Sequence, residues 1–274
     1  MRKIVVIGMI FILTMPAIAT NDAIDHVDFI SNNNDEKTLY VGGSGPNNYT
    51  KIQNAINDSN DGDTVFVYSG IYNESIMLYK RINLIGEHRE KTIISARGGD
   101  GINITAEGVS VNNFTITDAV PPYSGVQLYK TANNIISHCD IYGCKDGIVL
   151  FFSHNNEIQE CNISTDGGGI MLWQSSLNKI KLCNIVGTTN SMSLFGYLTF
   201  GNLITNNNFI DNRWDPVFTN SIHNLWFHNY WDDWHKIVPK PIFGINLIFL
   251  TIQIPWIQFD WHPAKEPIRM VEVK

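Results

Sequence analysis

The sequence has few charged residues and no basic tract. Only 16% of its 274 residues are charged, and 19 Lys and Arg stand against 26 Asp and Glu, which gives a formal net charge of −7. Without clustered cations, the chain lacks the electrostatic footprint of a nucleic-acid-binding protein. The low charge combined with 44% apolar residues also excludes a coiled coil and a disordered acidic chain. The composition therefore allows a packed core.

The sequence also lacks an apolar run long enough to cross a membrane as a helix, which needs about 20 residues. The first run, at 4–15, spans about 12 residues, and the second, at 242–254, spans about 13 and includes three polar residues. Two basic residues precede the first run and Ala-Ile-Ala follows it, so we predict a signal peptide over residues 1–19. The protein would then be secreted, periplasmic or held at the cell surface, with no transmembrane segment in the mature chain.

The middle of the chain repeats at a fixed interval. A phrase of Gly, apolar, any residue, Leu and aromatic begins at Gly125, Gly147 and Gly169, in steps of 22 residues. A second phrase follows each one, with Asn-x-Ile leading to Cys-x-Ile, and it continues in weaker form at Asn202 and Asn224. Apolar and polar residues alternate with the period of a half-buried strand, and the absence of helical spacing excludes a leucine-rich repeat. The repeat predicts an all-β protein, a parallel β-helix with two or three short strands per turn.

Turns of a β-helix stack about 4.8 Å apart, so equivalent residues should form columns along its axis. Repeated Leu and Ile positions are expected to point inward as the core. Asparagines at the bends are interpreted as a structural ladder, in which each carboxamide bonds its own backbone and the neighbouring turn. The Leu column comprises Leu128, Leu150, Leu172 and Leu194, and the Ile column Ile136, Ile158, Ile180 and Ile204. The ladder comprises Asn134, Asn156, Asn178, Asn202 and Asn224.

Three of the four cysteines, Cys139, Cys161 and Cys183, fall in one inward column. Adjacent turns would bring their Cα atoms within disulfide range, and stacked thiols could also hold a soft metal. We favour buried free thiols, because small apolar side chains suit a tight corner. A disulfide that involves Cys144 or one pair of the column, and a metal site, are the alternatives.

Segments outside the repeat are predicted to cap it. Residues 48–56 should form a short helix, with Thr50 and Gln53 in capping-box positions and an apolar face that plugs the first coil. The chain then divides into a signal peptide at 1–19, a flexible leader at 20–37, a β-helix with its N-terminal cap at 38–235, and a Trp-rich C-terminal cap and tail at 236–274.

Several of these motifs resemble the pectin-lyase-like right-handed parallel β-helix superfamily, and specifically its NosD-type members. They are the helix, the Gly-Asp-Thr-Val strand at 62–65, the Gly-x-Tyr-x-Glu turn at 70–74 and the Gly-Ile coils. The ending at 229–234 and 255–264 is similar to the terminal motif of secreted NosD-like proteins common in archaea. The resemblance covers most of residues 38–267 and implies the fold and export. It implies little about activity, because the superfamily holds lyases, hydrolases, esterases and non-catalytic surface proteins alike.

Catalytic groups are not evident in the sequence. A lyase for acidic polysaccharides would need clustered carboxylates for Ca²⁺ beside a basic residue, and a hydrolase would need paired carboxylates. Asp232 and Asp233 are sequence neighbours and so should point to opposite faces of an extended segment. The acids near the coil bends do not share a column: Asp100, Asp118, Asp140, Asp146 and Asp166. We therefore predict a non-catalytic protein without a cofactor, with a polysaccharide lyase or hydrolase as the alternative.

A role in copper handling, which the NosD name suggests, is a further alternative. The Met residues are scattered, and the histidines show no repeated ligand spacing. Histidine and aspartate residues gather near the C-terminus and could bind a metal. The other interpretation is that this segment forms a cap, in which the histidines satisfy backbone groups around tryptophans. The candidate metal ligands are His223, His228, Asp232, His235 and His262.

One hint of function is a column of aromatic residues. An aromatic follows each Leu of the inward column, and strand alternation should turn it outward. Exposed aromatic rows bind sugar faces or mark partner surfaces, unless the chain bends after each Leu or the apolar tail at 242–254 lies across them. We predict a carbohydrate-binding module for a polysaccharide or cell-envelope glycan. Its candidate binding residues are Tyr129, Phe151, Trp173 and Phe195.

Asn-x-Ser/Thr triplets are possible glycan acceptors in an exported protein, although an Asn-rich chain also produces them by chance. The six candidates are Asn48, Asn57, Asn73, Asn103, Asn113 and Asn162.

Overall fold

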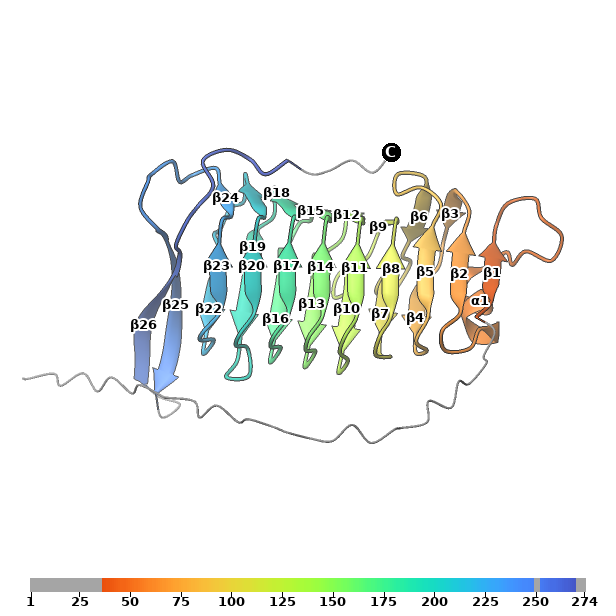
Figure 1. Ribbon diagram of the computed structural model, residues 1–274, viewed down its shortest axis with the longest axis horizontal. Helices are drawn as coiled ribbons and strands as arrows, with labels where there is room; N and C mark the ends of the chain where they lie inside the picture. The colour runs from red at the N-terminus through yellow and green to blue at the C-terminus, as the bar shows by residue number, and fades with distance from the viewer. Residues whose placement is uncertain (1–35, 249–251, 270–274) are drawn as a thin grey trace, which may run out of the picture. The chain divides into compact units, whose positions relative to one another are not determined.

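The computed structural model describes residues 36–248 and 252–269 (Figure 1). They form a parallel β-helix of about nine turns, as the repeat predicts. Each complete turn contributes one strand to each of three stacks, and neighbouring strands of a stack pair in parallel and in register. The predicted signal peptide and all but the last two residues of the predicted leader lie outside the described residues.

Two of the stacks form an 18-stranded sheet with the C-terminal hairpin, and the third forms an 8-stranded sheet. The first stack contains β1 (Thr38–Val41), β2 (Thr64–Val67), β5 (Asn83–Gly86), β8 (Ser110–Asn112), β11 (Ile135–Ser137), β14 (Glu157–Gln159), β17 (Lys179–Lys181), β20 (Leu203–Thr205) and β23 (Leu225–Phe227). The long-strand stack contains β4 (Ile76–Leu78), β7 (Ile102–Ile104), β10 (Ser124–Tyr129), β13 (Asp146–Phe151), β16 (Gly168–Trp173), β19 (Asn190–Phe195) and β22 (Val217–Thr219). The third stack contains β3 (Gly70–Tyr72), β6 (Thr92–Ser95), β9 (Thr115–Thr117), β12 (Asp140–Tyr142), β15 (Asn162–Ser164), β18 (Asn184–Val186), β21 (Asn208–Ile210) and β24 (Tyr230–Trp231). The hairpin consists of β25 (Lys240–Ile248) and β26 (Ile252–Asp260).

The core consists of the predicted columns. All four residues of the Leu column and all four of the Ile column are fully buried. In the later turns Phe218 extends the Leu column and Trp226 extends the Ile column. Each buried aliphatic side chain contributes about 1.5–3 kcal/mol of transfer free energy, so repetition alone builds a large core.

Hydrogen bonds join the five asparagines of the predicted ladder from turn to turn. The side-chain oxygen of Asn156 accepts both the backbone N–H and the amide N–H of Asn134, each at 3.0 Å. The same pair of bonds joins Asn156 to Asn178, Asn178 to Asn202, and Asn202 to Asn224. The ladder satisfies backbone donors at a buried bend, where an unpaired N–H is costly.

The cysteine column is also confirmed as a column, and it continues as a second ladder. Cys139, Cys161 and Cys183 are fully buried and unpaired, as is Cys144 at 1% exposure. In the following turns amides replace the thiols. Cys183 N–H donates to Asn207 Oδ1 at 2.9 Å, and Asn207 N–H donates to Asn229 Oδ1 at 3.0 Å.

The N-terminal cap differs from the prediction in how it begins. The helix α1 spans Ile52–Asp58, and its N-cap, Lys51, makes no side-chain capping bond, so the predicted capping box of Thr50 and Gln53 is wrong. Instead the carboxylate of Glu74 accepts the N–H groups of Ile52 at 2.9 Å and Gln53 at 3.2 Å. A carboxylate from the first coil therefore satisfies the free donors at the positive end of the helix. The apolar face is buried as expected.

The C-terminal cap is built around stacked aromatics and one buried carboxylate. The rings of Phe209 and Trp231 stack with centroids 4.3 Å apart. Asp260 at the end of β26 is fully buried and accepts bonds from Asn229 N–H at 2.9 Å and from the Trp231 indole N–H at 3.1 Å. Asp260 thus ends the second ladder. The one helix within the described ranges, with seven residues, is too short to cross a bilayer.

Candidate functional site

The aromatic column lies on the outer face of the long-strand stack. Tyr129 pairs with Phe151, Phe151 with Trp173, and Trp173 with Phe195, so the four residues align in successive turns. Tyr129 and Trp173 are 41% and 43% exposed, and the two phenylalanines are half-buried. The Trp173 and Phe195 rings meet edge to face, with centroids 5.9 Å apart. The predicted alignment and outward direction are therefore present.

A second outward column runs beside the aromatic one. It contains Gln127, Val149, Met171, Ser193 and Val217, which pair in register from β10 to β22. Val149 and Ser193 are buried, and Gln127 is tied by its amide to Asp100 at 3.1 Å. The face thus carries a column of aromatic side chains beside a second column in which Val149 and Ser193 are buried.

The described part of the C-terminal tail does not cover this column. Strand β25 pairs in parallel with β22, with Thr219 opposite Ile245, and so extends the long-strand stack by one more strand (Figure 1). The expectation that the tail lies across the aromatic residues is wrong for these residues. The tail pairs with β22 through β25, and this pairing places it at the end of the stack.

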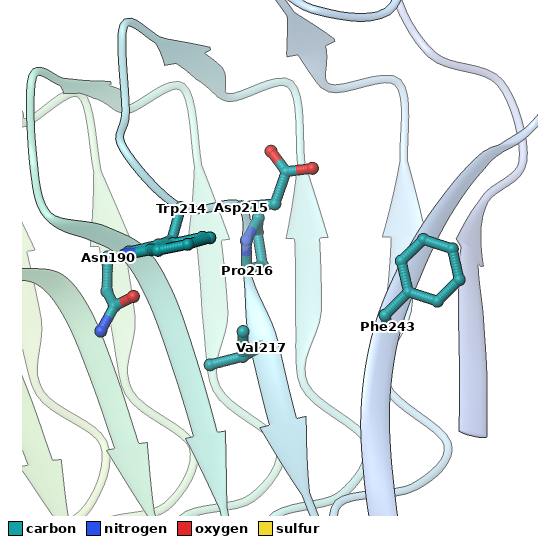
Figure 2. A pocket seen from close by; sticks show the side chains of 6 residues that line it. All are labelled: Asn190, Trp214, Asp215, Pro216, Val217 and Phe243. Atoms are coloured by element: carbon teal, nitrogen blue, oxygen red, sulfur yellow. The ribbon is translucent and has the colours of Figure 1, made fainter. Parts of the chain in front are cut away.

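A pocket that the sequence does not predict lies at this end of the same face. It encloses about 300 Å³. Figure 2 shows Trp214 on one side and Phe243 on the other, with Pro216 and Val217 between them. The remaining lining residues are Asn190 and Asp215.

The pocket exists because strand β22 begins late. Pro216 has no N–H to donate to the sheet. Asp215 occupies the position that Gly147 and Gly169 hold in earlier turns, where a Cβ atom would lie 2.4 and 2.5 Å from a carbonyl oxygen of the next turn. Ser191 holds this position in the turn before and is buried, whereas the side chain of Asp215 is 51% exposed and reaches Lys240. The backbone of Trp214 stays anchored by its N–H bond to the Thr189 carbonyl at 3.0 Å.

Electrostatically, the pocket is bordered by carboxylates that share one buried cation. Lys240 is 4% exposed, and its ammonium lies 2.8 Å from Asp215 Oδ2 and 2.6 Å from Asp233 Oδ2. The ammonium also lies 5.6 Å from the Trp231 ring centre and 5.3 Å from that of Trp234. Burial lowers the pKa of Lys240, but the bonds to the two carboxylates outweigh it and leave the pKa above its ordinary value. The side chain of Asp215 is 51% exposed.

The five candidate metal ligands do not assemble. His228 and His262 both donate their backbone N–H groups to Asp260 and flank the ring of Phe227. Asp232 accepts the backbone N–H of Asp211. The structure brings neither His223 nor His235 to this group, and in the described ranges no three His, Cys, Asp or Glu side chains converge as metal ligands. Asp260 accepts these backbone N–H groups in the cap. The cap interpretation assigned this role to the histidine rings.

The glycan-acceptor candidates differ in exposure. Asn57 and Asn73 are exposed, and the other four are half-buried. The amide of Asn162 is engaged on both sides, because its nitrogen donates to Asp140 at 2.7 Å and its oxygen accepts from Asn184 at 2.7 Å. Exposure therefore favours Asn57 and Asn73 as acceptors.

Sequence reasoning missed Trp214, Asp215 and Phe243. A signal for the first two was present, since Asp-Pro replaces the Gly-Ile phrase of the repeat at 215–216. Phe243 comes from outside the repeat, so its position in the pocket depends on where β25 docks.

Comparison with known proteins identifies the family and the fold. The family model described as "Periplasmic copper-binding protein (NosD)" matches residues 52–237. Among curated proteins, none matches the chain. The solved structures that resemble it include an alginate lyase from Paenibacillus sp. str. FPU-7, with 14% identity, coverage of 72% of this chain and 77% of that chain, and a TM-score of 0.53. Pectin methylesterase PemA from Erwinia chrysanthemi has 14% identity, coverage of 74% and 81%, and a TM-score of 0.50. The catalytic domain of a GH87 α-1,3-glucanase in complex with tetrasaccharides has 18% identity, coverage of 73% and 40%, and a TM-score of 0.59.

At these identities the solved structures establish the right-handed β-helix fold and nothing finer.

The copper named in the family description does not fit the described side chains. Copper(I) needs thiolate, thioether or imidazole ligands on one site. Hydrogen bonding to Cys161 and burial raise the pKa of the Cys139 thiol well above its ordinary value. Among the described residues, the histidines near the C-terminus do not converge with other ligands into a group of three.

Proposed function

The chain belongs to the NosD family of β-helix proteins, and we propose that it is an exported, non-catalytic module that binds a glycan along the outer face of its long-strand stack. The observation that carries this proposal is the in-register column from Tyr129 to Phe195, with exposed rings at Tyr129 and Trp173. Export rests on the predicted signal peptide over residues 1–19.

Strands stacked about 4.8 Å apart place these side chains in successive turns along the axis. Each ring offers an apolar face, and binding costs little conformational entropy because a packed sheet fixes the side chains beforehand. A pyranose ring also has apolar C–H faces and hydroxyls at its edge, so it can lie on a ring and still bond to neighbouring polar groups. Lys130, whose ammonium lies 5.1 Å from the Tyr129 ring centre, is one such group.

The non-catalytic part of the proposal rests on the acids of this face. Asp100 accepts the N–H and hydroxyl of Ser124 and the amide of Gln127, and Asp146 accepts the N–H of Gly168. Both carboxylates therefore hold strands in place. A polysaccharide-active enzyme is the second candidate, favoured by the enzymes among the similar solved structures.

The test is a glycan array on the mature protein, with and without Ca²⁺, followed by titration of the glycans that bind. Trp173→Ala should raise Kd about 5- to 30-fold, the loss of about 1–2 kcal/mol expected for an aromatic binding anchor. Trp261→Ala is the matched control, because Trp261 is 61% exposed and lies outside the column. Equal affinity of wild type and Trp173→Ala would contradict the proposal, and shortened or unsaturated glycan products would favour the enzyme.

A further inference from the structure

We infer that the pocket between Trp214 and Phe243 is a subsite for a neutral sugar ring, and that Asp215 makes it discriminate against uronic acids. This inference rests on the proposed function, because it assigns a ligand class to one end of the same face. It concerns residues that lie outside the aromatic column.

The shape of the pocket suits one or two sugar rings. Its volume of about 300 Å³ is at the small end of ligand pockets. Trp214 and Phe243 are 57% and 63% exposed and stand on opposite sides, while Pro216 and Val217 form an apolar floor (Figure 2). A ring between the two aromatic side chains would lie beside Asp215, whose carboxylate stands at the rim of the pocket, while Asn190 lies beyond Trp214 (Figure 2).

The polar groups of the pocket accept hydroxyl donors. Asp215 is the charged residue of the lining, and the Asn190 amide is the other polar group. A hydroxyl that donates to a carboxylate forms a charge-assisted bond, which is stronger than a neutral one. The accessible charge in the pocket is therefore negative, and it favours a ligand rich in hydroxyls.

A uronate would lack a cation to pair with in this pocket. Lys240 is buried and already bonded to Asp215 and Asp233. Arg213 is exposed, with its guanidinium 5.9 Å from the Trp214 ring centre, and it does not line the pocket. A sugar carboxylate in the pocket would thus face the carboxylate of Asp215, and the resulting repulsion should weaken as salt rises.

The subsite is preformed and lies on the same sheet face as the aromatic column, with Trp214 aligned to Gly168, five residues before Trp173 along the strand. Trp214 is held by backbone bonds to the strand before it, and Asp215 is held by Lys240 at 2.8 Å. Strands β16 and β22 are two turns apart, so the pocket lies about 10 Å along the axis from Trp173. An oligosaccharide of a few rings can therefore contact both.

The experiment is calorimetric titration of the mature protein with two probes, nigero-oligosaccharides as neutral glucans and oligogalacturonates as uronates. Wild type should bind the neutral probe more tightly. Trp214→Ala should weaken that binding at least about 5-fold, and Asp215→Asn should weaken it while strengthening uronate binding. Trp256→Ala is the matched control, because Trp256 is 49% exposed on the same hairpin and alternates to the opposite face from Phe243. Thermal melts of each variant check that the fold is retained.

The results separate this inference from the proposed function. Tighter uronate binding by wild type, or equal affinities of Trp214→Ala and Trp256→Ala, would overturn the subsite. If Trp173→Ala loses affinity while Trp214→Ala does not, the subsite fails and the glycan-binding face stands. If wild type binds neither these probes nor the glycan array, the proposed function fails as well.

Discussion

Replacing Asn178 with alanine should destabilise the β-helix strongly and leave glycan binding unchanged. Asn178 is fully buried, and its amide nitrogen donates to Ser153 O and to Asn202 Oδ1, each at 3.0 Å. Its oxygen accepts the backbone N–H of Asn156 at 2.9 Å and the Asn156 amide at 3.0 Å. The substitution removes all four bonds and leaves the two Asn156 donors unpaired.

Each buried donor without a partner costs about 1–3 kcal/mol, so the free energy of unfolding should fall by about 4 kcal/mol. For a domain of this size 1 kcal/mol shifts the melting temperature by about 2–4 °C, which predicts a loss of about 8–16 °C. Binding should not change, because the ladder lies in the core, away from the aromatic face.

The assay is thermal and guanidinium unfolding followed by circular dichroism. Asn184→Ala is the matched control, because Asn184 also bonds to asparagines in both adjacent turns but is half-buried on the outer face of the third stack. Water can replace its bonds, so the control should lose less than about 1 kcal/mol. If the two variants lose equal stability, the ladder does not have the role assigned to it.

Two further predictions concern the thiols and the N-terminal cap. The denatured, unreduced protein should show four reactive thiols, and the native protein should show none at about pH 8. All four thiols are at most 1% exposed, and burial raises the pKa of Cys144 to about 11. A count of two thiols in the denatured protein would mean a disulfide. Glu74→Ala should cost about 1–2 kcal/mol of stability and Thr50→Ala less than about 0.5 kcal/mol, since Glu74 bonds the first helical N–H groups; the reverse order would restore the capping box.

Prediction from the sequence succeeded where the repeat places residues directly. In a β-helix one period becomes one turn, so residues 22 apart, such as Cys139 and Cys161, become neighbours without any knowledge of loop geometry. The aromatic column follows in the same way from the Leu column and strand alternation.

Prediction failed where a contact joins the repeat to something outside it. Glu74 reaches α1 from the first coil, and Asp260 reaches Asn229 across 31 residues. Ile52 and Glu74 are one period apart, but Ile52 lies in the helix α1 and Glu74 in the first coil, so the repeat does not predict their contact. The 31 residues between Asn229 and Asp260 do not match the period. The pocket depends on two departures from the repeat. Asp215 and Pro216 interrupt a strand, and Phe243 belongs to the C-terminal hairpin.

By itself, the sequence determined the β-helix, the order of its columns and the direction in which the aromatic residues face, because a regular period translates into position one turn at a time. Only the tertiary structure decided what closes each end and that a pocket opens beside Trp214. Those features depend on how β25 and β26 dock on the last turns and on the ion pairs of Lys240 with Asp215 and Asp233. Such docking results from packing and charge pairing between segments that share no pattern.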